Sequence, residues 1–132
     1  MKDYTLQNKR AWEYDAYAFW VKQMGEPAKA AQDILADPNR GMRRFARYFH
    51  GFEGLRVANI CGSCGKKALA MAALGAQVSV FDLSEANRRY AMEMAQAAGY
   101  SLDYQLGDVM EIDLGKYGAC FDVVFMEGGI LS

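Results

Sequence analysis

Histidine is almost absent from this sequence, which contains only His50 among 132 residues. A Ser-His-Asp or Cys-His catalytic arrangement would have to use that residue, which precedes the first strand-like segment. We therefore do not expect hydrolysis of this type. Cysteine is also scarce, and three residues without a secretion signal do not predict a disulfide framework.

The chain lacks both an excess of one charge and a long apolar run. Its formal net charge is -1, so no general attraction toward nucleic acid or an anionic membrane is expected. No apolar stretch approaches the roughly 20 residues that span a bilayer, and the N-terminus lacks the apolar core of a signal peptide. We expect a cytoplasmic protein whose partner is a small-molecule substrate, with no nucleic acid and no membrane.

The first 50 residues are expected to form a helical cap. Helical patterns cover residues 8–24, 28–36 and 39–49, and Pro27 suits the first turn of the second helix. The third pattern carries a stripe of arginines at helical spacing: Arg40, Arg43, Arg44 and Arg47. This stripe is either a solvated face with scattered ion pairs or a contact for an acidic substrate or partner.

From residue 51 to residue 132, strand and helix patterns alternate, which predicts an α/β domain with a parallel sheet and helices on both faces. The expected strands cover residues 56–60, 77–81, 101–106 and 121–126, and the expected helices cover residues 65–74 and 85–98. Ser84 is suited to cap the second of these helices, and Gly99 is suited to end it.

The last two strands differ in pattern. Residues 101–106 alternate, with Leu102, Tyr104 and Leu106 on one side, which predicts the edge of a sheet. Residues 121–126 are almost continuously apolar, which is typical of a strand with neighbours on both sides. The chain ends six residues later. Because an open apolar edge pairs readily with another chain, we expect a longer domain truncated after its fourth strand, or a homodimer or other chain that covers this edge.

The loop after the first strand contains only small residues. They are Cys61, Gly62, Ser63, Cys64 and Gly65. In a doubly wound fold such a loop lets a ligand approach the backbone, and the following helix presents free N–H groups to an anionic group. The full G-x-G-x-x-G pattern is missing, so the glycines alone are weak evidence.

Two aspartates follow later strands at the same rim of the sheet. Asp82 closes the second strand about 20 residues after the loop, where an acid is expected to accept hydrogen bonds from ribose hydroxyls. Its structural alternative is a helix N-terminal cap or the solvation of a loop. Asp108, together with the Val109 amide, is placed to hold the edge of a base, although an ordinary loop aspartate is the rival interpretation. The pattern predicts a site for a nucleotide-like ligand.

Cys61 and Cys64 also form a CxxC pair before a helix, which by itself favours dithiol redox chemistry. No proline follows the pair and no tryptophan adjoins Cys61, so the likeness to thioredoxin is incomplete. Zinc binding by this pair with Cys120 and His50 is disfavoured, because Cys120 precedes its strand and would lie at the opposite rim, roughly 20 Å away. We expect no metal.

The segment VANICGSCGKKALAMAALGAQVSVFDLSEANRRYA resembles the glycine loop, first helix and acidic second strand of class I S-adenosylmethionine-dependent methyltransferases. QLGDV and FDVVFMEGG are similar to the next two motifs of that family. The resemblance begins near Leu55 and implies a Rossmann-like sheet with strand order 3-2-1-4, a variable N-terminal cap and S-adenosyl-L-methionine as cofactor. It also implies further strands beyond the fourth.

The resemblance assigns roles to residues at the rim. Residues 61–65 would surround the methionine part of the cofactor, and Asp82 and Leu83 its ribose and adenine. Glu127 would border the methyl group and position the acceptor, as the catalytic candidate. The expected cofactor-binding set is Asn59, Cys61, Gly62, Ser63, Gly65, Asp82, Leu83, Asp108, Val109, Glu127 and Gly128.

Three positions depart from the family pattern. Asn59 stands where the first strand usually ends in an acid, and Cys61 and Ser63 stand where glycines are common. Weaker or altered cofactor binding is therefore expected.

We expect a methyltransferase that acts on a small-molecule acceptor, and we expect this chain alone to be inactive. The alternatives are a non-catalytic nucleotide- or adenosylmethionine-binding module and a CxxC oxidoreductase. Aromatic residues of the first helix either pack in a core or roof the pocket: Trp12, Tyr17, Phe19 and Trp20.

Overall fold

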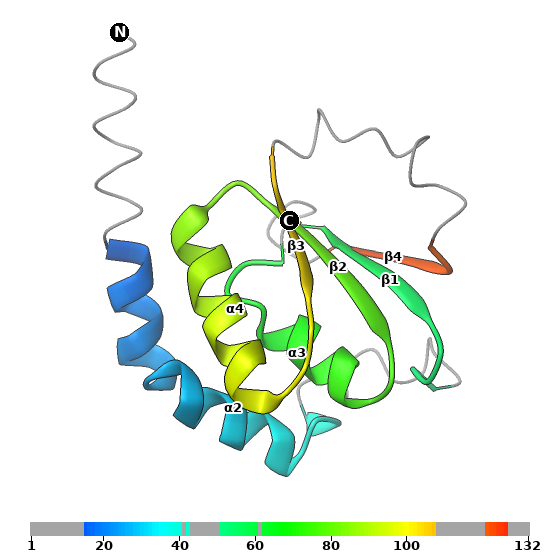
Figure 1. Ribbon diagram of the computed structural model, residues 1–132, viewed down its shortest axis with the longest axis horizontal. Helices are drawn as coiled ribbons and strands as arrows, with labels where there is room; N and C mark the ends of the chain where they lie inside the picture. The colour runs from blue at the N-terminus through cyan, green and yellow to red at the C-terminus, as the bar shows by residue number, and fades with distance from the viewer. Residues whose placement is uncertain (1–14, 41, 43–50, 61, 108–120, 127–132) are drawn as a thin grey trace, which may run out of the picture.

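The computed structural model describes residues 15–40, 42, 51–60, 62–107 and 121–126 (Figure 1). Residues 15–24 are helical. The elements that follow are α2 (Pro27–Ala36), β1 (Arg56–Ile60), α3 (Lys66–Ala73), β2 (Gln77–Asp82), α4 (Glu85–Ala98), β3 (Asp103–Leu106) and β4 (Val123–Met126). The predicted strands and helices of the α/β part are thus confirmed to within two residues at each end. Most of the third expected helix, residues 39–49, lies outside the described residues.

The four strands form one parallel sheet in the order β3-β2-β1-β4, as predicted (Figure 1). β3 lies at an edge, in agreement with its alternating pattern. Leu102 and Tyr104 are buried, whereas Leu106 is 41% exposed because it is the last residue of this edge strand. Among the described strands β4 pairs only with β1, so the expected second neighbour of β4 is not among them.

Local sequence signals set the ends of the helices. The Ser84 hydroxyl accepts the N–H of Asn87 at 3.1 Å and caps α4, and Gly99 ends that helix in the left-handed conformation, with φ of 81°. Pro27 occupies the first turn of α2, where its missing N–H costs no hydrogen bond. All three predictions are confirmed.

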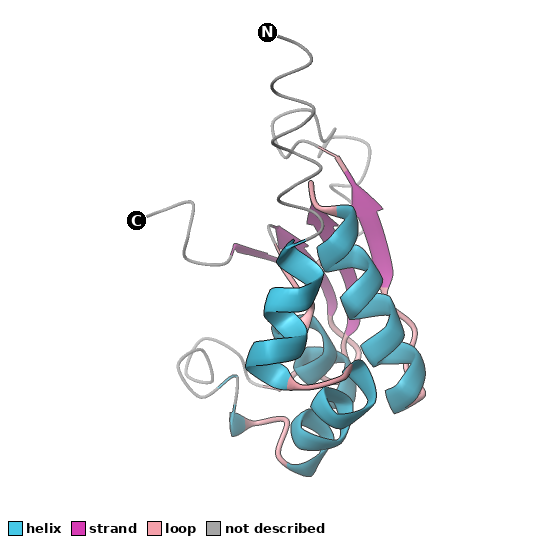
Figure 2. Ribbon diagram, turned by 90° about the vertical axis from the view of Figure 1, so that its left-hand side faces the viewer, coloured by secondary structure: helices cyan, strands magenta, loops and turns pink. Residues whose placement is uncertain are grey.

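The described helices pack on one face of the sheet (Figure 2). Val57, Val78 and Val80 project from the strands into the main core. On the helical side this core contains the largest fully buried side chains, among them Leu69, Met71, Tyr90 and Met94. The expected helices on the second face are not among the described elements; that face carries a smaller cluster of Ala58, Ile60 and Phe81. No helix in the described part of the chain is both long and apolar enough to cross a membrane.

Candidate cofactor-binding site

The loop between β1 and α3 passes close to its neighbours. A Cβ atom on Gly62 would lie 2.3 Å from a methyl group of Val80, and one on Gly65 would lie 2.6 Å from the Ala91 Cβ. Gly65 also has φ of +82° and is the N-cap of α3. Side chains at these two positions would push the loop away from β2 and α4. Only glycine therefore fits the space at Gly62, and at Gly65 glycine is needed both for the close contact and for the positive φ.

Ser63 is the described non-glycine residue with a positive φ, 55°. The left-handed conformation costs a non-glycine residue roughly 1 kcal/mol. The predicted departure at this position, a serine where glycine is common, therefore has a physical cost in this fold.

Asp82 joins this loop to the end of β2. Its Oδ2 accepts the N–H of Ser63 at 2.7 Å, and its Oδ1 accepts the N–H groups of Leu83 at 2.6 Å and Ser84 at 3.2 Å. The carboxylate is half-buried. The helix-cap alternative does not describe it, because the Ser84 hydroxyl caps α4. The structure places Asp82 as a fixed acceptor between two loops.

Tyr104 holds the same loop from β3. Its hydroxyl donates to the carbonyl oxygen of Ser63 at 2.6 Å, while the N–H of Gly107 donates to the Asp82 carbonyl oxygen at 3.0 Å. The carboxyl ends of β1, β2 and β3 are thereby connected at one rim. The role of Tyr104 was not predicted from the sequence, although its inward position in an alternating strand was a usable signal.

Asn59 lies below the loop, in β1. The residue is 0% exposed, and neither its Nδ2 nor its Oδ1 has a hydrogen-bond partner among the described residues. The same amide group would lie 3.1 Å from a Cβ on Gly62. A buried amide without a partner costs about 1–3 kcal/mol, and such groups mark sites where a ligand or an ordered water completes the hydrogen bonding.

The predicted site residues that the structure describes therefore share one rim. Leu83 is 59% exposed beside Asp82 and is available to contact a flat ring. The remaining predicted residues lie outside the described residues: Cys61, Asp108, Val109, Glu127 and Gly128.

Cys64, the second cysteine of the CxxC pair, is buried, whereas Cys61, which would attack a substrate, lies outside the described residues. Cys64 is 3% exposed, and its Sγ lies 3.6 Å from the Sδ of Met24. A thiol so enclosed is poorly accessible to a disulfide substrate. Within the described residues no three His, Cys, Asp or Glu side chains gather to hold a metal ion; Cys61, Cys120 and His50 lie outside that part of the chain.

The aromatic residues of the first helix attach it to α4. The Trp20 indole N–H donates to Asn87 Oδ1 at 2.7 Å, and the Tyr17 hydroxyl donates to the Glu93 carboxylate at 2.9 Å. Tyr17 also meets the Tyr90 ring edge to face, with centroids 5.7 Å apart. Packing thus accounts for Tyr17 and Trp20, whereas Phe19 is 50% exposed and Trp12 lies outside the described residues.

Tyr90 connects α4 to the turn before α2. Its hydroxyl donates to the Gly25 carbonyl oxygen at 2.7 Å. Burial raises the pKa of Tyr90 from its usual 10.0 to about 12, with further contributions from Cys64, Tyr17 and Glu26. The phenol therefore stays protonated and supports the N-terminal part beside the loop.

A sequence model of a methyltransferase domain matches residues 60–131, more than half of the chain. The chain belongs to this methyltransferase family. The predicted recognition is confirmed, and the expectation of S-adenosylmethionine as cofactor agrees with it. A comparison with curated proteins gives no match.

Solved structures resemble this methyltransferase chain over most of its length. The crystal structure of EvdMO1 has a TM-score of 0.58 and 26% identity, and the match covers 68% of this chain and 22% of EvdMO1. The N-terminal domain of EvdMO1, solved in the presence of SAH and D-fucose, has a TM-score of 0.52 and 27% identity over 67% of this chain and 37% of that one.

A third structure supports the fold alone. It is the structure reported under the conversion of a disulfide bond into a thioacetal group during echinomycin biosynthesis. It matches with a TM-score of 0.54 and 23% identity over 83% of this chain and 45% of its own. The present chain thus spans less than half the length of each of these relatives.

Proposed function

We propose that this chain forms the cofactor-binding part of an S-adenosylmethionine-dependent methyltransferase that acts on a small-molecule acceptor. The position of Asp82 carries the proposal. Its carboxylate is fixed by the N–H groups of Ser63, Leu83 and Ser84 at the end of β2, and it retains about one lone pair for a ribose hydroxyl, since a carboxylate accepts about four hydrogen bonds.

The described residues fit this cofactor at three further points. The partnerless amide of Asn59 is buried beneath the loop, where an ordered water can link it to the polar methionine end. Gly62 keeps the loop close to Val80, and exposed Leu83 offers an apolar surface for adenine. Asn59 brings no negative charge, so affinity below that of relatives with an acid here is expected.

The bound cofactor would supply an electrophilic methyl group to an acceptor nucleophile. The protein then needs mainly to hold the acceptor in line and exclude water, because alignment alone lowers the barrier by several kcal/mol. We assign the positioning of the acceptor to Glu127, next to Gly128. This role is tested by Glu127→Gln, which should lower the rate of methyl transfer by more than it lowers the affinity for S-adenosylhomocysteine; an equal loss in both would assign Glu127 to the cofactor alone.

The substitution Asp82→Asn tests the ribose contact. We expect the affinity for S-adenosylhomocysteine to fall about tenfold, the usual worth of one or two charge-assisted hydrogen bonds. An analogue without ribose hydroxyls should bind both proteins equally. Asp103→Asn is the matched control, because Asp103 lies at the other end of the sheet and accepts from Ser79. Unchanged affinity in Asp82→Asn would contradict the assignment.

Tyr104→Phe separates ribose binding from loop support. It removes the hydroxyl that holds Ser63 and leaves the Asp82 carboxylate intact. If Asp82 acts through the ribose, the Tyr104→Phe protein should still discriminate against the analogue without hydroxyls. If this variant binds S-adenosylhomocysteine and the analogue without hydroxyls equally well, the loss of affinity in Asp82→Asn results from a displaced loop and not from a lost ribose contact.

We also propose that another chain segment, from a longer gene product or a second copy, pairs with β4. Among the described strands β4 contacts β1 alone, and Val124 is 57% exposed. Light scattering of the chain at increasing concentration tests whether the partner is a second copy. Self-association that Val124→Lys abolishes would support a second copy, and a monomer at every concentration would contradict it.

A further inference from the structure

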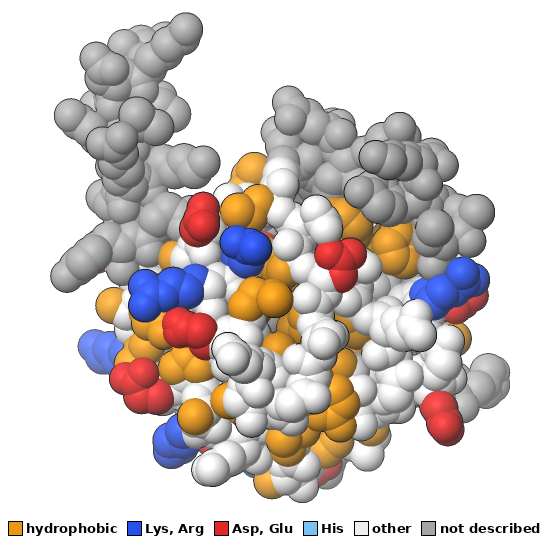
Figure 3. Space-filling view, viewed as in Figure 1, with side chains coloured by type: hydrophobic (Ala, Val, Ile, Leu, Met, Phe, Trp, Pro, Cys, Tyr) orange, Lys and Arg blue, Asp and Glu red, His pale blue; other side chains and the backbone are white. Residues whose placement is uncertain are grey.

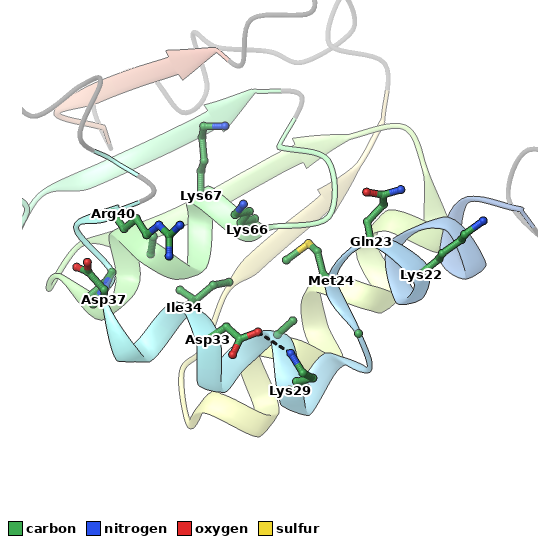
Figure 4. A pocket seen from close by; sticks show the side chains of 14 residues that line it. Lys22, Gln23, Met24, Lys29, Asp33, Ile34, Asp37, Arg40, Lys66 and Lys67 are labelled. Atoms are coloured by element: carbon green, nitrogen blue, oxygen red, sulfur yellow. Dashed lines mark hydrogen bonds and ion pairs between the residues drawn. The ribbon is translucent and has the colours of Figure 1, made fainter.

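The structure contains a cavity of about 590 Å³ between the N-terminal helices and the start of α3 (Figure 4). Its volume lies within the range of small-molecule sites. It adjoins the cofactor loop through Met24, whose sulfur contacts Cys64, and through Lys66, which follows Gly65.

Cations dominate the charged lining of this cavity. Five cationic residues contribute, Lys22, Lys29, Arg40, Lys66 and Lys67, against two acids, Asp33 and Asp37. Lys29 and Asp33 neutralise each other across 3.0 Å. The remaining cations come from three separate segments and have no ion-pair partner among the described residues. By contrast, charges of both signs are mixed over the visible helices (Figure 3).

Lys66 and Lys67 occupy the first turn of α3, which contains no acid. The positive end of a helix dipole favours negative side chains there, so both lysines have the sign that lowers helix stability. Residues that break a local rule without a stabilising contact are expected at functional sites. An anion bound in the cavity would neutralise the charges of both lysines and interact favourably with the positive end of the helix.

The rest of the lining is apolar, formed by Met24, Ala30, Ile34, Pro38 and Ala70. Figure 4 shows Ile34 and Met24 among the labelled charged side chains, of which Lys22 points away from the cavity. A bare inorganic ion would leave these surfaces in water, whereas an organic anion would cover them.

We propose that this cavity binds a small organic phosphate, with its phosphate between Arg40 and the lysines of α3 and its apolar part against Ile34. The site is separate from that of the cofactor, and it does not depend on the proposed function. It also gives Arg40, the described member of the arginine stripe, a role as an anion contact.

Phenyl phosphate is the probe. Inorganic phosphate and phenol, which correspond to its anionic and apolar parts, are the comparison ligands. We expect saturable binding in which phenyl phosphate is tighter than inorganic phosphate and phenol does not bind. Amide shifts followed by NMR should move at Gly25, Lys66 and Lys67. Absence of binding by both phosphates, or shifts confined to other residues, would overturn the proposal.

Substitutions test which cations contact the phosphate. Lys67→Gln and Arg40→Gln should each weaken phenyl phosphate binding about tenfold, whereas Lys67→Arg, which keeps the positive charge, should retain most of the affinity. Arg88→Gln, an equal charge change on α4 outside the cavity, should have no effect. An equal loss in Arg88→Gln would show that only the overall charge matters and would overturn the site.

Two more measurements test the unfavourable charge of Lys66 and the independence of the cavity from the cofactor. Lys66→Glu should raise the thermal midpoint without phosphate, through the helix dipole, and should abolish phenyl phosphate binding. A lower midpoint with retained binding would contradict the proposal.

A competition titration tests the independence of the cavity. Displacement of phenyl phosphate by S-adenosylhomocysteine would assign the cavity to the cofactor and overturn the separate site.

Discussion

The backbone N–H of Ser63 donates a hydrogen bond to the Asp82 carboxylate across 2.7 Å and joins the loop after β1 to the end of β2. The Tyr104 hydroxyl holds the same residue on its other side, through the Ser63 carbonyl oxygen. The loop is therefore positioned by an acid from β2 and a phenol from β3, and it remains close to β2 through Gly62.

We predict that only glycine fits at position 62, because Val80 occupies the space that a side chain would need. Gly62→Ala should lower the free energy of unfolding by about 1–3 kcal/mol, because the new methyl would overlap Val80. Urea denaturation measures the change. Gly107→Ala is the control at the same rim, since nothing lies within 4 Å of its Cβ position. Similar losses in both variants would contradict the close approach.

The backbone of Ser63 is predicted to be strained. Ser63→Gly should raise the free energy of unfolding by a few tenths to about 1 kcal/mol, since glycine adopts φ of 55° without a steric penalty. Ser101→Gly, in the exposed segment before β3, should give no gain. A loss of stability in Ser63→Gly, measured by the same denaturation, would argue against the left-handed conformation.

The buried Asn59 amide is predicted to contribute nothing to stability in the absence of ligand. Asn59→Leu should leave the free energy of unfolding within about 1 kcal/mol of the parent, because replacing a partnerless polar group by an apolar one of similar size removes a desolvation cost. Asn59→Asp should lower it by more than about 2 kcal/mol at pH 7 and by less in acid, where the carboxyl is protonated. If Asn59→Leu is the more damaging variant, the amide has a partner in solution.

Tyr90 is predicted to make stability depend on pH in the alkaline range. Its pKa is about 12 in the folded protein against 10.0 for the free group, so the folded state favours the protonated phenol. This contribution is complete below pH 10 and is lost as the pH rises toward 12. Tyr90→Phe should flatten the decline between those values and cost about 1 kcal/mol at pH 7, where the Gly25 carbonyl oxygen loses its donor.

Exposed Tyr100 provides the comparison for Tyr90. Tyr100→Phe should leave the alkaline decline unchanged, since that phenol is not part of the buried contact. The measurement is the thermal midpoint at a series of pH values from 9 to 12. The account of Tyr90 is wrong if both variants follow the parent curve.

Short-range signals explain why most of the fold could be predicted from the sequence. The alternation of apolar strands with capped helices defined the parallel sheet, and Ser84 and Gly99 marked the ends of α4 to the residue. The position of Asp82 at the carboxyl end of β2 identified the rim of the site, because the carboxyl ends of parallel strands meet at one edge of the sheet.

Contacts between distant segments could not be predicted in the same way. The bond from Tyr104 to Ser63 joins residues 41 positions apart, and the partnerless amide of Asn59 depends on what surrounds it rather than on its neighbours in sequence. The apolar pattern of β4 indicated two neighbouring strands, while the described sheet supplies one. Glu127, Asp108 and Cys61 lie outside the described residues, and their roles stay predictions.

The central claim is that the rim formed by Asn59, Gly62 and Asp82 binds an adenosyl cofactor, and calorimetric titration of the protein tests it most directly. S-adenosylhomocysteine and S-adenosylmethionine should each bind with one saturable site, and NAD should give no heat of binding under the same conditions. Saturable binding of NAD, or the failure of both adenosyl ligands to bind, would contradict the account.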